Sequence, residues 1–418
     1  MDTVQKRVTV IGGGIAGLTA AWELALSGIN VDLVEKTSFL GGHAIQFCCK
    51  ATEECRQCGA CSVEEMLKNV VQEPGINVHF NSIPEKVERN GNFSIVLKKR
   101  PLYIDPKKCT NCGECYERCH EQGVVMQGYS KNNSPLYAID ASKCMEVQEK
   151  GVCKKCEDSC PEGAINLSAG VSEETVESDA VVLASGFTPF DPEIKPTYGY
   201  GKFSNMVTGL DLEKSIREKG SVVRPSDGKK PERMAFIQCV GSRDNRLGNL
   251  WCSKVCCPYA MRMAELIKKN NPETDITIFY MDIQNAGKDF PVFYEQCKSD
   301  LHFVRTIPVD FIPDQEGGLK TRYMSETDGA PLDEVFDMVV LSIGIMPGVD
   351  NESLAKLFNV ELNDDGFIAG YKGIDRSLTA NDGVFVAGTI EGPKDIAASK
   401  AQAGNAVSDV VKYLRRAK

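Results

Sequence analysis

The stretch Val8-Thr-Val-Ile-Gly-Gly-Gly-Ile-Ala-Gly17 decides the fold, because a β-branched run passes directly into a glycine-rich turn. Helical periodicity follows from Leu18 to Leu26, and a second strand at 30–34 is closed by the acid Glu35. This order of strand, Gly-x-Gly-x-x-Gly, helix and strand is the context that a dinucleotide-binding unit requires. The alternative is a purely structural turn in an α/β domain.

The glycines of this turn have separate roles in a dinucleotide site. Gly12 permits the tight turn, Gly14 lets the backbone approach a pyrophosphate, and Gly17 lets the helix pack closely on the strand. The helix N-terminus then presents free N–H groups to the phosphates. Glu35 lies where a carboxylate accepts hydrogen bonds from an adenosine ribose. The residues expected to contact the dinucleotide here are Gly12, Gly14, Ile15, Ala16, Gly17, Glu35 and Lys36.

Later motifs favour FAD over NAD as the dinucleotide. Gly41-Gly42-His43 follows the acid at the spacing found in flavoproteins with two dinucleotide-binding domains. Two buried strands end in small residues, and a last strand at 383–388 resembles the flavin strand of that superfamily. This strand ends in Gly388-Thr389 where Gly-Asp is usual, so a backbone N–H or the threonine hydroxyl would make the ribityl contact. The expected contacts are Gly41, Gly42, His43, Ala184, Ser185, Gly186, Gly344, Gly388, Thr389, Lys394, Asp395 and Ile396.

Lys394 and Arg262 are candidate cations for tuning the flavin. The C-terminal helix, expected from Ala397 to Arg416, would direct its positive N-terminal end at the flavin pyrimidine, where reduced flavin is anionic. Either cation could stabilise that charge, and the alternative is that both are ordinary surface or helix-capping charges. No other catalytic side chain is expected, because the cofactors would carry the chemistry.

A second α/β unit begins at Met234-Ala-Phe-Ile-Gln238, where a thioredoxin-reductase-like protein would bind NAD(P)H. Its turn reads Cys239-Val-Gly-Ser-Arg243 and carries no Gly-x-Gly-x-x-Gly. The pyridine-nucleotide site is therefore expected to be lost. This argues against one alternative function, an NAD(P)H-dependent reductase of the glutamate-synthase small-subunit type.

Eighteen cysteines are far too many for a cytoplasmic chain of 418 residues by chance. Thirteen lie between Cys48 and Cys160 and four more between Cys239 and Cys257, which leaves Cys297 alone as an expected core residue. Disulfides are disfavoured in the cytoplasm, so this clustering indicates metal binding, redox chemistry or both.

A duplicated cysteine module occupies residues 101–168. Cys109-x2-Cys112-x2-Cys115-x3-Cys119 has the spacing of a bacterial ferredoxin, in which the fourth cysteine ligates the other cluster. The partner run, Cys144-x8-Cys153-x2-Cys156-x3-Cys160, differs from that spacing by a loop insertion after Cys144. Two zinc sites are the alternative, but zinc prefers Cys-x2-Cys pairs with a long spacer. We expect two [4Fe–4S] clusters, one held by Cys109, Cys112, Cys115 and Cys160, the other by Cys119, Cys144, Cys153 and Cys156.

Two further cysteine sets are less regular. Cys239-x12-Cys252-x3-Cys256-Cys257 stands in the vacated nucleotide site, and these four residues are expected to bind a [4Fe–4S] cluster close to the flavin. Buried free thiols are the alternative there. Cys49-x5-Cys55-x2-Cys58-x2-Cys61 follows Gly41-Gly42 and is a candidate for a fourth cluster. A redox-active thiol pair beside the flavin, or inert thiols, are the alternatives for this set.

Composition bounds the remaining possibilities. A net charge of −10 argues against nucleic acid as a partner, and 42% hydrophobic with 25% charged residues is an ordinary globular balance. No apolar run approaches the ~18–20 residues that cross a bilayer, so no direct membrane insertion is expected. The first residues lead directly into the strand that begins near Arg7, which leaves no room for a signal peptide and suggests a cytoplasmic protein.

Together the motifs predict an α/β fold: a two-dinucleotide-binding-domain, thioredoxin-reductase-like flavoprotein with an inserted ferredoxin-like 2[4Fe–4S] module. The predicted divisions are a first part of the FAD-binding domain at 1–100, the ferredoxin module at 101–168, a second part with linker at 169–230, the second α/β domain at 231–332 and a third FAD-binding part at 333–418.

The flavin unit, the ferredoxin module, the Cys239–Cys257 set and Gly392-Pro-Lys-Asp-Ile396 together resemble the A subunit of heterodisulfide reductase, over essentially the whole chain. Within that family the length is most similar to the A subunits of quinone-interacting membrane-bound oxidoreductases (QmoA-like) of sulfate reducers. The resemblance implies an electron-transfer flavoprotein in a multi-subunit complex. Its flavin would convert between two-electron and one-electron transfer.

The resemblance also implies partners and a location. Electrons would pass between membrane menaquinol and adenylylsulfate (APS) reductase. The partners would be a second flavin and iron–sulfur subunit (QmoB-like) and a haem-bearing membrane subunit (QmoC-like), which would place the chain in the cytoplasm at the inner membrane. The alternative is a heterodisulfide-reductase-type subunit in another, bifurcating complex.

Overall fold

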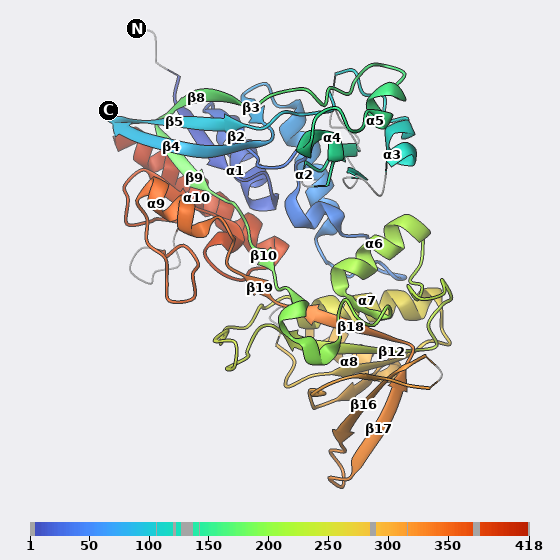
Figure 1. Ribbon diagram of the computed structural model, residues 1–418. Helices are drawn as coiled ribbons and strands as arrows, with labels where there is room; N and C mark the ends of the chain where they lie inside the picture. Colours follow the sequence, from blue (N-terminus) through green and yellow to red (C-terminus); the bar gives the residue numbers. More distant parts are fainter. Residues whose placement is uncertain are drawn as a thin grey trace.

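The computed structural model describes residues 5–105, 107–119, 123–126, 137–141, 143–284, 290–315, 317–370 and 377–416. The chain forms two α/β units, each built around its own five-stranded sheet, and a small cysteine-rich module (Figure 1). In that view the second unit lies below the first. Within these described ranges, no helix combines the length and the apolar character that crossing a membrane requires.

The first sheet is parallel and has the strand order β20-β9-β1-β2-β3. Strand β1 lies in the middle, where Val8 pairs with Val31 on one side and with Ala180 on the other. The sheet therefore draws its strands from both ends and the middle of the chain. Its strands are β1 (Arg7–Ile11), β2 (Asn30–Val34), β3 (Ile76–His79), β9 (Ala180–Leu183) and β20 (Val384–Val386).

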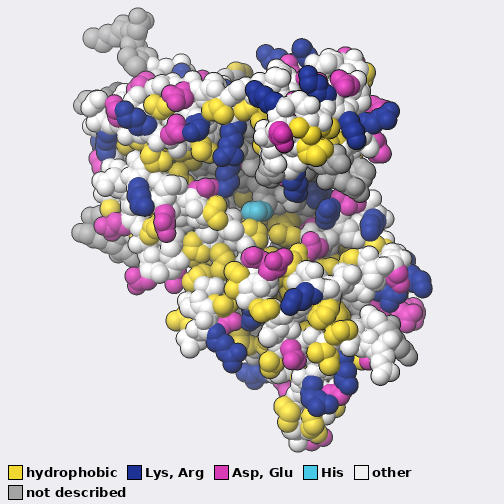
Figure 2. Space-filling model, viewed as in Figure 1, with side chains coloured by type: hydrophobic (Ala, Val, Ile, Leu, Met, Phe, Trp, Pro, Cys, Tyr) yellow, Lys and Arg dark blue, Asp and Glu magenta, His cyan; other side chains and the backbone are white. Residues whose placement is uncertain are grey.

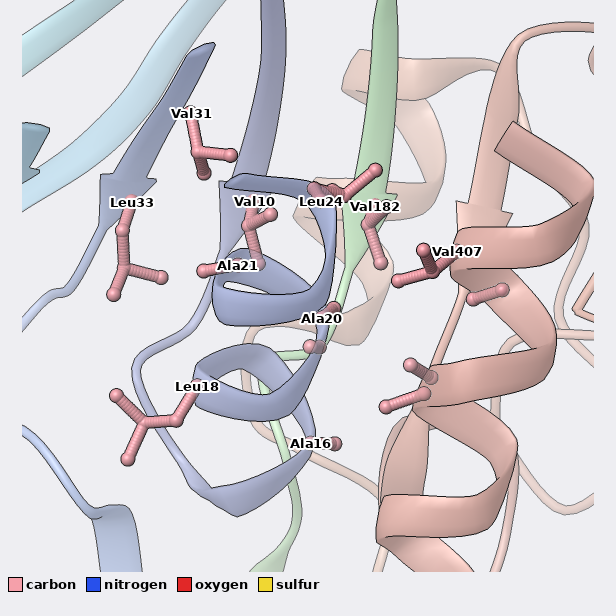
Figure 3. Close-up of a cluster of buried hydrophobic side chains, with 14 of the residues drawn as sticks. Val10, Ala16, Leu18, Ala20, Ala21, Leu24, Val31, Leu33, Val182 and Val407 are labelled. Atoms are coloured by element: carbon pink, nitrogen blue, oxygen red, sulfur yellow. The ribbon is translucent and has the colours of Figure 1, made fainter. Parts of the chain in front are cut away.

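Alternate residues of these strands face two different layers. Val10, Leu33 and Val182 point toward helix α1 and pack in one cluster with α1, α2 and α10 (Figure 3). Ile11 and Leu183 face the antiparallel sheet β4-β5-β8 and helix α9. Burial on both faces explains why the strands are almost continuous apolar runs. These elements are α1 (Ile15–Leu26), α2 (Ala60–Gln72), α9 (Asn351–Phe358), α10 (Ile396–Arg416), β4 (Ser82–Asn90), β5 (Asn92–Lys99) and β8 (Ser172–Ser178).

The second sheet is also parallel, with the order β11-β18-β12-β13-β14. Met234 and Phe236 on β12 pack with helices α6, α7 and α8, whereas Ala235 and Ile237 face the antiparallel sheet β15-β16-β17. The strands are β11 (Met206–Thr208), β12 (Arg233–Val240), β13 (Asp275–Phe279), β14 (His302–Val304) and β18 (Met338–Ile343). The covering elements are α6 (Gly209–Lys219), α7 (Cys256–Asn270), α8 (Phe290–Asp300), β15 (Ile312–Pro313), β16 (Leu319–Met324) and β17 (Pro331–Phe336).

Two strands lie in a different sheet from the one the sequence suggests. The expected divisions assign β11 and β18 to the FAD-binding domain, but both pair in the second sheet. The sequence cannot distinguish the two cases, because β18 has the same buried apolar character and small-residue end as β9. The chain crosses between the units at a short antiparallel pair, β10 (Thr188–Pro189) with β19 (Ile345–Met346).

The cysteine-rich module is reached from β5 and left through β8, which are antiparallel neighbours. Its ends lie together: Asp105 N donates to Ala164 O at 2.8 Å, and Asn166 N donates to Tyr103 O at 2.8 Å. The chain therefore leaves and re-enters the first unit at one place. The module contains α3 (Glu114–Cys119), β6 (Val124–Met126), β7 (Tyr137–Ile139), α4 (Met145–Gln148) and α5 (Lys155–Asp158).

Candidate functional site

A cavity of about 480 Å³ lies at the carboxyl ends of β1, β2 and β9. This is the end of a parallel sheet at which ligands usually bind, and the volume is that of an ordinary small-molecule site. Loops of the first unit form one wall, and Pro258, Tyr259 and Arg262 of α7 belong to the other. Figure 2 shows the molecule hollowed between its upper and lower parts.

The cavity brings together most of the side chains that the sequence predicts for a dinucleotide site. The residues that the sequence predicts and that line the cavity are Gly12, Gly14, Ile15, Ala16, Glu35, Lys36, Gly41, Gly42, His43, Ala184, Ser185, Gly186, Arg262, Thr389, Lys394, Asp395 and Ile396. Gly17, Gly344 and Gly388 are not among the lining residues. Gly344 N donates to Val240 O of β12 at 2.8 Å, and Gly388 N donates to Gln402 Oε1 of α10 at 2.9 Å, so the N–H groups of both are already used.

The glycine turn is shaped by close backbone contacts and leaves room on one side. A Cβ on Gly12, whose φ is +109°, would lie 2.3 Å from Ala184 O, and one on Gly17 would lie 1.8 Å from Gly12 O. A Cβ on Gly14 would meet nothing within 4 Å. Close packing therefore requires glycine at positions 12 and 17. The open space at Gly14, beside the N-terminus of α1, fits the approach of a pyrophosphate.

The Glu35 carboxylate is occupied by the chain itself. Oε2 accepts from Gly13 N at 2.7 Å, and Oε1 accepts from both Thr37 N and Thr37 Oγ1 at 2.8 Å. Burial raises the pKa of this carboxyl, and the three donors oppose that rise. The carboxylate thus fixes the glycine turn to the end of β2, and Oε2, which accepts a single hydrogen bond, still has a lone pair for a ribose hydroxyl.

Polar groups of the cavity wall show that it fits a polar ligand. The Ser185 hydroxyl is buried and has no hydrogen-bond partner among the described residues. His43 Nε2 lies 3.2 Å from Phe187 O, and burial lowers the pKa of His43, which favours the neutral imidazole. Buried polar atoms normally have partners, so a bound ligand is the natural partner for Ser185.

Two cations face the cavity from opposite units. Lys394 of the first unit is paired with Glu391 at 2.8 Å. Arg262 of α7 is half-buried, its Nε has no partner in the described part of the chain, and burial lowers its pKa. Arg262 therefore has an uncommitted donor, whereas the Lys394 charge is already neutralised by its neighbour.

A buried ion pair beside the cavity has no counterpart in the sequence analysis. Lys50 Nζ donates to Glu213 Oε1, and the two side chains are 2% and 1% exposed. Tyr259 donates its hydroxyl to the same carboxylate oxygen at 2.9 Å, and Cys48 N donates to the other at 2.8 Å. The Lys50 ammonium also lies 5.1 Å from the centre of the Tyr259 ring. No local pattern marks Lys50, because its partners come from α6 and α7 of the other unit.

The thiols of the module are arranged in two groups. A small cavity is lined by Cys109, Cys112, Cys115 and Cys160, the four residues that the ferredoxin spacing assigns to one cluster. Burial, together with the nearby Cys119 and Cys144, raises the pKa of Cys156 to about 12. Cys153 N donates to Glu146 Oε2 at 2.9 Å, which fixes the inserted loop after Cys144.

The Cys239 group, defined as Cys239, Cys252, Cys256 and Cys257, gathers at one end of the second sheet. Cys239 is near the end of β12 with a φ of +59°, and Cys256 and Cys257 are the first two residues of α7. Burial raises the pKa of all three of these thiols, and nearby cysteines of the group add to the rise. The remaining set is open instead: Cys49, Cys55 and Cys61 are exposed, and only Cys58 lines the large cavity.

All eighteen cysteines are free thiols. In the ranges that the structure covers, no three His, Cys, Asp or Glu side chains lie close enough to hold a single metal ion as they stand. Iron–sulfur clusters spread their thiolate ligands around a group of several atoms rather than around one ion. The grouping of several thiols is therefore the relevant geometry. One set of the module surrounds a small cavity, and the Cys239 group gathers at one end of the second sheet.

Comparisons with known proteins agree with this architecture. A family model described as an NAD(P)-binding Rossmann-like domain matches residues 10–47. The chain is 35% identical over 426 residues to the A subunit of the H(2):CoB-CoM heterodisulfide,ferredoxin reductase of Methanothermobacter marburgensis, covering 97% of this chain and 63% of the relative. It is 34% identical over 431 residues to the iron-sulfur A subunit of the CoB--CoM heterodisulfide reductase of Methanocaldococcus jannaschii, covering 97% and 64%. The chain thus spans less than two thirds of the length of these curated relatives.

Among solved structures, the thioredoxin reductase of Lactococcus lactis matches with a TM-score of 0.55 at 13% identity, over 99% of this chain and 100% of that chain. At this identity the likeness concerns the fold alone. It confirms the predicted α/β architecture with two dinucleotide-binding-type units.

Proposed function

We propose that the chain, as a member of the family of heterodisulfide reductase A subunits, is an electron-transfer oxidoreductase component. FAD would bind in the large cavity, and [4Fe–4S] clusters would bind at the cysteine groups. One observation carries the proposal. Helix α7 begins with Cys256 and Cys257, and its next turns contribute Pro258, Tyr259 and Arg262 to the cavity wall. When bound, the flavin would supply two-electron and one-electron chemistry, and each cluster would transfer single electrons.

The residues of the chain have distinct tasks in this proposal. The open side of Gly14 and the N-terminus of α1 bind the pyrophosphate, and Glu35 keeps the glycine turn in register. Arg262 offers a partly buried positive charge to the reduced, anionic flavin. The Cys239 group stands where a related fold would hold a nicotinamide, so electron transfer replaces hydride transfer.

The cofactor set extends to the module. We propose two clusters there, with the ligands assigned above, because one assigned set already surrounds a cavity. A fourth cluster at Cys49, Cys55, Cys58 and Cys61 would require three exposed thiols, those of Cys49, Cys55 and Cys61, to close around it with Cys58. The ends of the module meet at one place on the first unit, which supports its treatment as an inserted domain.

We further propose that the chain works in a multi-subunit complex, because its relatives are named as single subunits of larger reductases. On the resemblance of its motifs, the finer proposal links membrane menaquinol to APS reductase through two further subunits. One would carry flavin and iron–sulfur groups, and the other would be a haem-bearing membrane protein. Purification with native partners tests this choice. Haem that copurifies with the chain would support the link to membrane menaquinol. Copurification of heterodisulfide-reducing subunits would instead support a heterodisulfide-reductase-type complex.

Anaerobic purification followed by flavin and iron counting tests the central proposal. We expect one FAD per chain, iron for at least three clusters, and a flavin that dithionite bleaches while NADH and NADPH do not. Zinc in place of iron would refute the cluster assignment. Rapid bleaching of the flavin by NADH or NADPH would show that the flavin still accepts hydride from a nicotinamide. That result would refute the proposed electron transfer from a cluster and favour a pyridine-nucleotide-dependent reductase.

A further inference from the structure

The Cys239 group has polar neighbours that the proposed function does not use. Arg243 lies beyond the turn that ends β12, and its guanidinium makes a two-pronged pair with Asp282: Nη2 donates to Oδ2 at 2.9 Å and Nη1 donates to Oδ1. The positive charge of the same guanidinium lies near the Cys239 thiol and opposes the rise that burial causes in the pKa of Cys239. Asp282 therefore holds a permanent positive charge against one sulfur of the group.

The backbone around this contact departs from a regular strand. Cys239 has a φ of +59° and Arg243 a φ of +54°, both in the left-handed region that side chains other than glycine rarely adopt. The pairing of β12 with β18 also shifts register between Ile237 and Val240. Such strain persists where surrounding contacts fix it, and it is concentrated at functional sites. Here the irregular backbone allows the side chains of Cys239 and Arg243 to lie near each other.

A second polar side chain directly precedes Cys239 at the end of the strand. Gln238 is 1% exposed, and neither its Nε2 nor its Oε1 has a partner in the part of the chain that the structure describes. Strand alternation places it on the face of Met234 and Phe236, which pack with Cys257 and α7. A buried amide without partners is costly, so its N–H groups are available to an acceptor at the cysteine group.

We propose that Arg243 and Gln238 are positioning residues that raise the reduction potential of a cluster bound at the Cys239 group. This inference rests on the proposed function, which supplies the cluster. Reduction adds negative charge to a cluster and its sulfurs, and hydrogen bonds to those sulfurs set the potential. A guanidinium and an amide N–H, both in a partly desolvated site, stabilise the reduced form more than the oxidised form. The cluster beside the cavity is thereby made the better electron acceptor.

Redox titration of the full chain, isolated anaerobically with its cofactors and followed by electron paramagnetic resonance, tests this inference. We expect Arg243→Met to shift the midpoint potential of the Cys239-group cluster to more negative values, with iron and flavin content unchanged. Arg243→Lys keeps the charge and should give a smaller shift. Gln238→Leu should also lower the potential, and it remains informative if Arg243→Met fails to fold.

Arg233→Met provides the matched control. Arg233 lies at the opposite end of β12 and pairs with Asp275 and Glu334, so its loss should leave the potential unchanged. Unchanged potentials in both Arg243→Met and Gln238→Leu, with the cluster present, would overturn the inference and leave the proposed function standing. Absence of iron from the Cys239 group in the unaltered chain would instead overturn the proposed function, and this inference with it.

Discussion

Glu35 shows how a single residue connects the glycine turn to the rest of the site. Its carboxylate accepts three hydrogen bonds, one from Gly13 and two from Thr37, although it is almost fully buried. The sequence motif predicts an acid here for the ribose. The structure adds that the same acid holds the turn in register before any ligand arrives.

Glu35→Gln should weaken dinucleotide binding. One acceptor oxygen becomes an N–H₂ donor, which must face either Gly13 N–H or the Thr37 donors and leaves a buried donor unpaired. Such a loss costs about 1–3 kcal/mol, equivalent to about a 5- to 150-fold weaker affinity if it falls on the bound state. FAD retained after gel filtration, compared with the unaltered chain, measures the effect.

Glu177→Gln is the control for this variant, since Glu177 is an exposed acid on β8 that accepts from Ser94 Oγ at 2.6 Å. It should retain the flavin fully. Equal retention by Glu35→Gln and Glu177→Gln would show that the Glu35 carboxylate does not organise the site.

Helix α7 is the element that joins the two proposed redox centres. Its first two residues are Cys256 and Cys257, and Pro258 follows where the missing N–H costs no helical hydrogen bond. The positive end of the helix favours thiolates at these positions. Four residues after Pro258, Arg262 reaches the cavity, so one rigid helix fixes the distance between both sites.

Cys256→Ala should lower the iron content by about one cluster while FAD stays bound. Cys297→Ala is the matched control, because Cys297 is a fully buried cysteine of α8 outside every proposed cluster. We expect that variant to lose a little stability and no iron. Iron and flavin analysis of both variants decides the matter; unchanged iron in Cys256→Ala would return the Cys239 group to buried thiols.

At the scale of the whole molecule, the segment that follows Gly41-Gly42 connects the two units through ion pairs. Lys50 pairs with Glu213 of α6, and Arg56 Nη2 lies 2.8 Å from Glu265 Oε2 of α7. The Lys50 pair is almost completely buried, and it lies beside the cavity between the units. The relative position of the large cavity and α7 therefore depends on ion pairs between the segment that contains Lys50 and Arg56 and the helices α6 and α7.

Lys50→Met should destabilise the chain by about 3–5 kcal/mol, because it leaves Glu213 as an uncompensated buried charge. Lys50→Met combined with Glu213→Gln removes that charge and should recover part of the loss. Thermal unfolding measures stability, and small-angle scattering reports whether the units separate. Lys98→Met breaks the exposed pair of Lys98 with Glu85 and should cost under about 1 kcal/mol. A Lys50→Met variant as stable as Lys98→Met would contradict this role.

The sequence by itself determined the features that depend on neighbouring residues. The glycine turn, its helix and the closing acid lie within about thirty residues, so their spacing alone predicts the first unit. The ferredoxin spacing likewise predicts that Cys109, Cys112, Cys115 and Cys160 share one site, and in the structure these four residues line one cavity. The fold class is confirmed, and relatives at 34–35% identity support the family resemblance. The cluster ligands stay predictions, and the domain divisions stay predictions except that β11 and β18 pair in the second sheet.

Only the tertiary structure decided which distant residues meet. Strands β9 and β18 have the same buried apolar character, and their sheet membership follows from the packing of whole layers. Lys50 meets Glu213 across 163 positions, and Arg243 meets Asp282 across 39. Such pairs leave no periodicity in the sequence, because charged side chains are common everywhere along the chain. The Lys50–Glu213 pair is selected by burial at the junction of the two units, and that burial exists only once both units have folded. The Arg243–Asp282 pair forms because the second sheet brings the segments after β12 and β13 together.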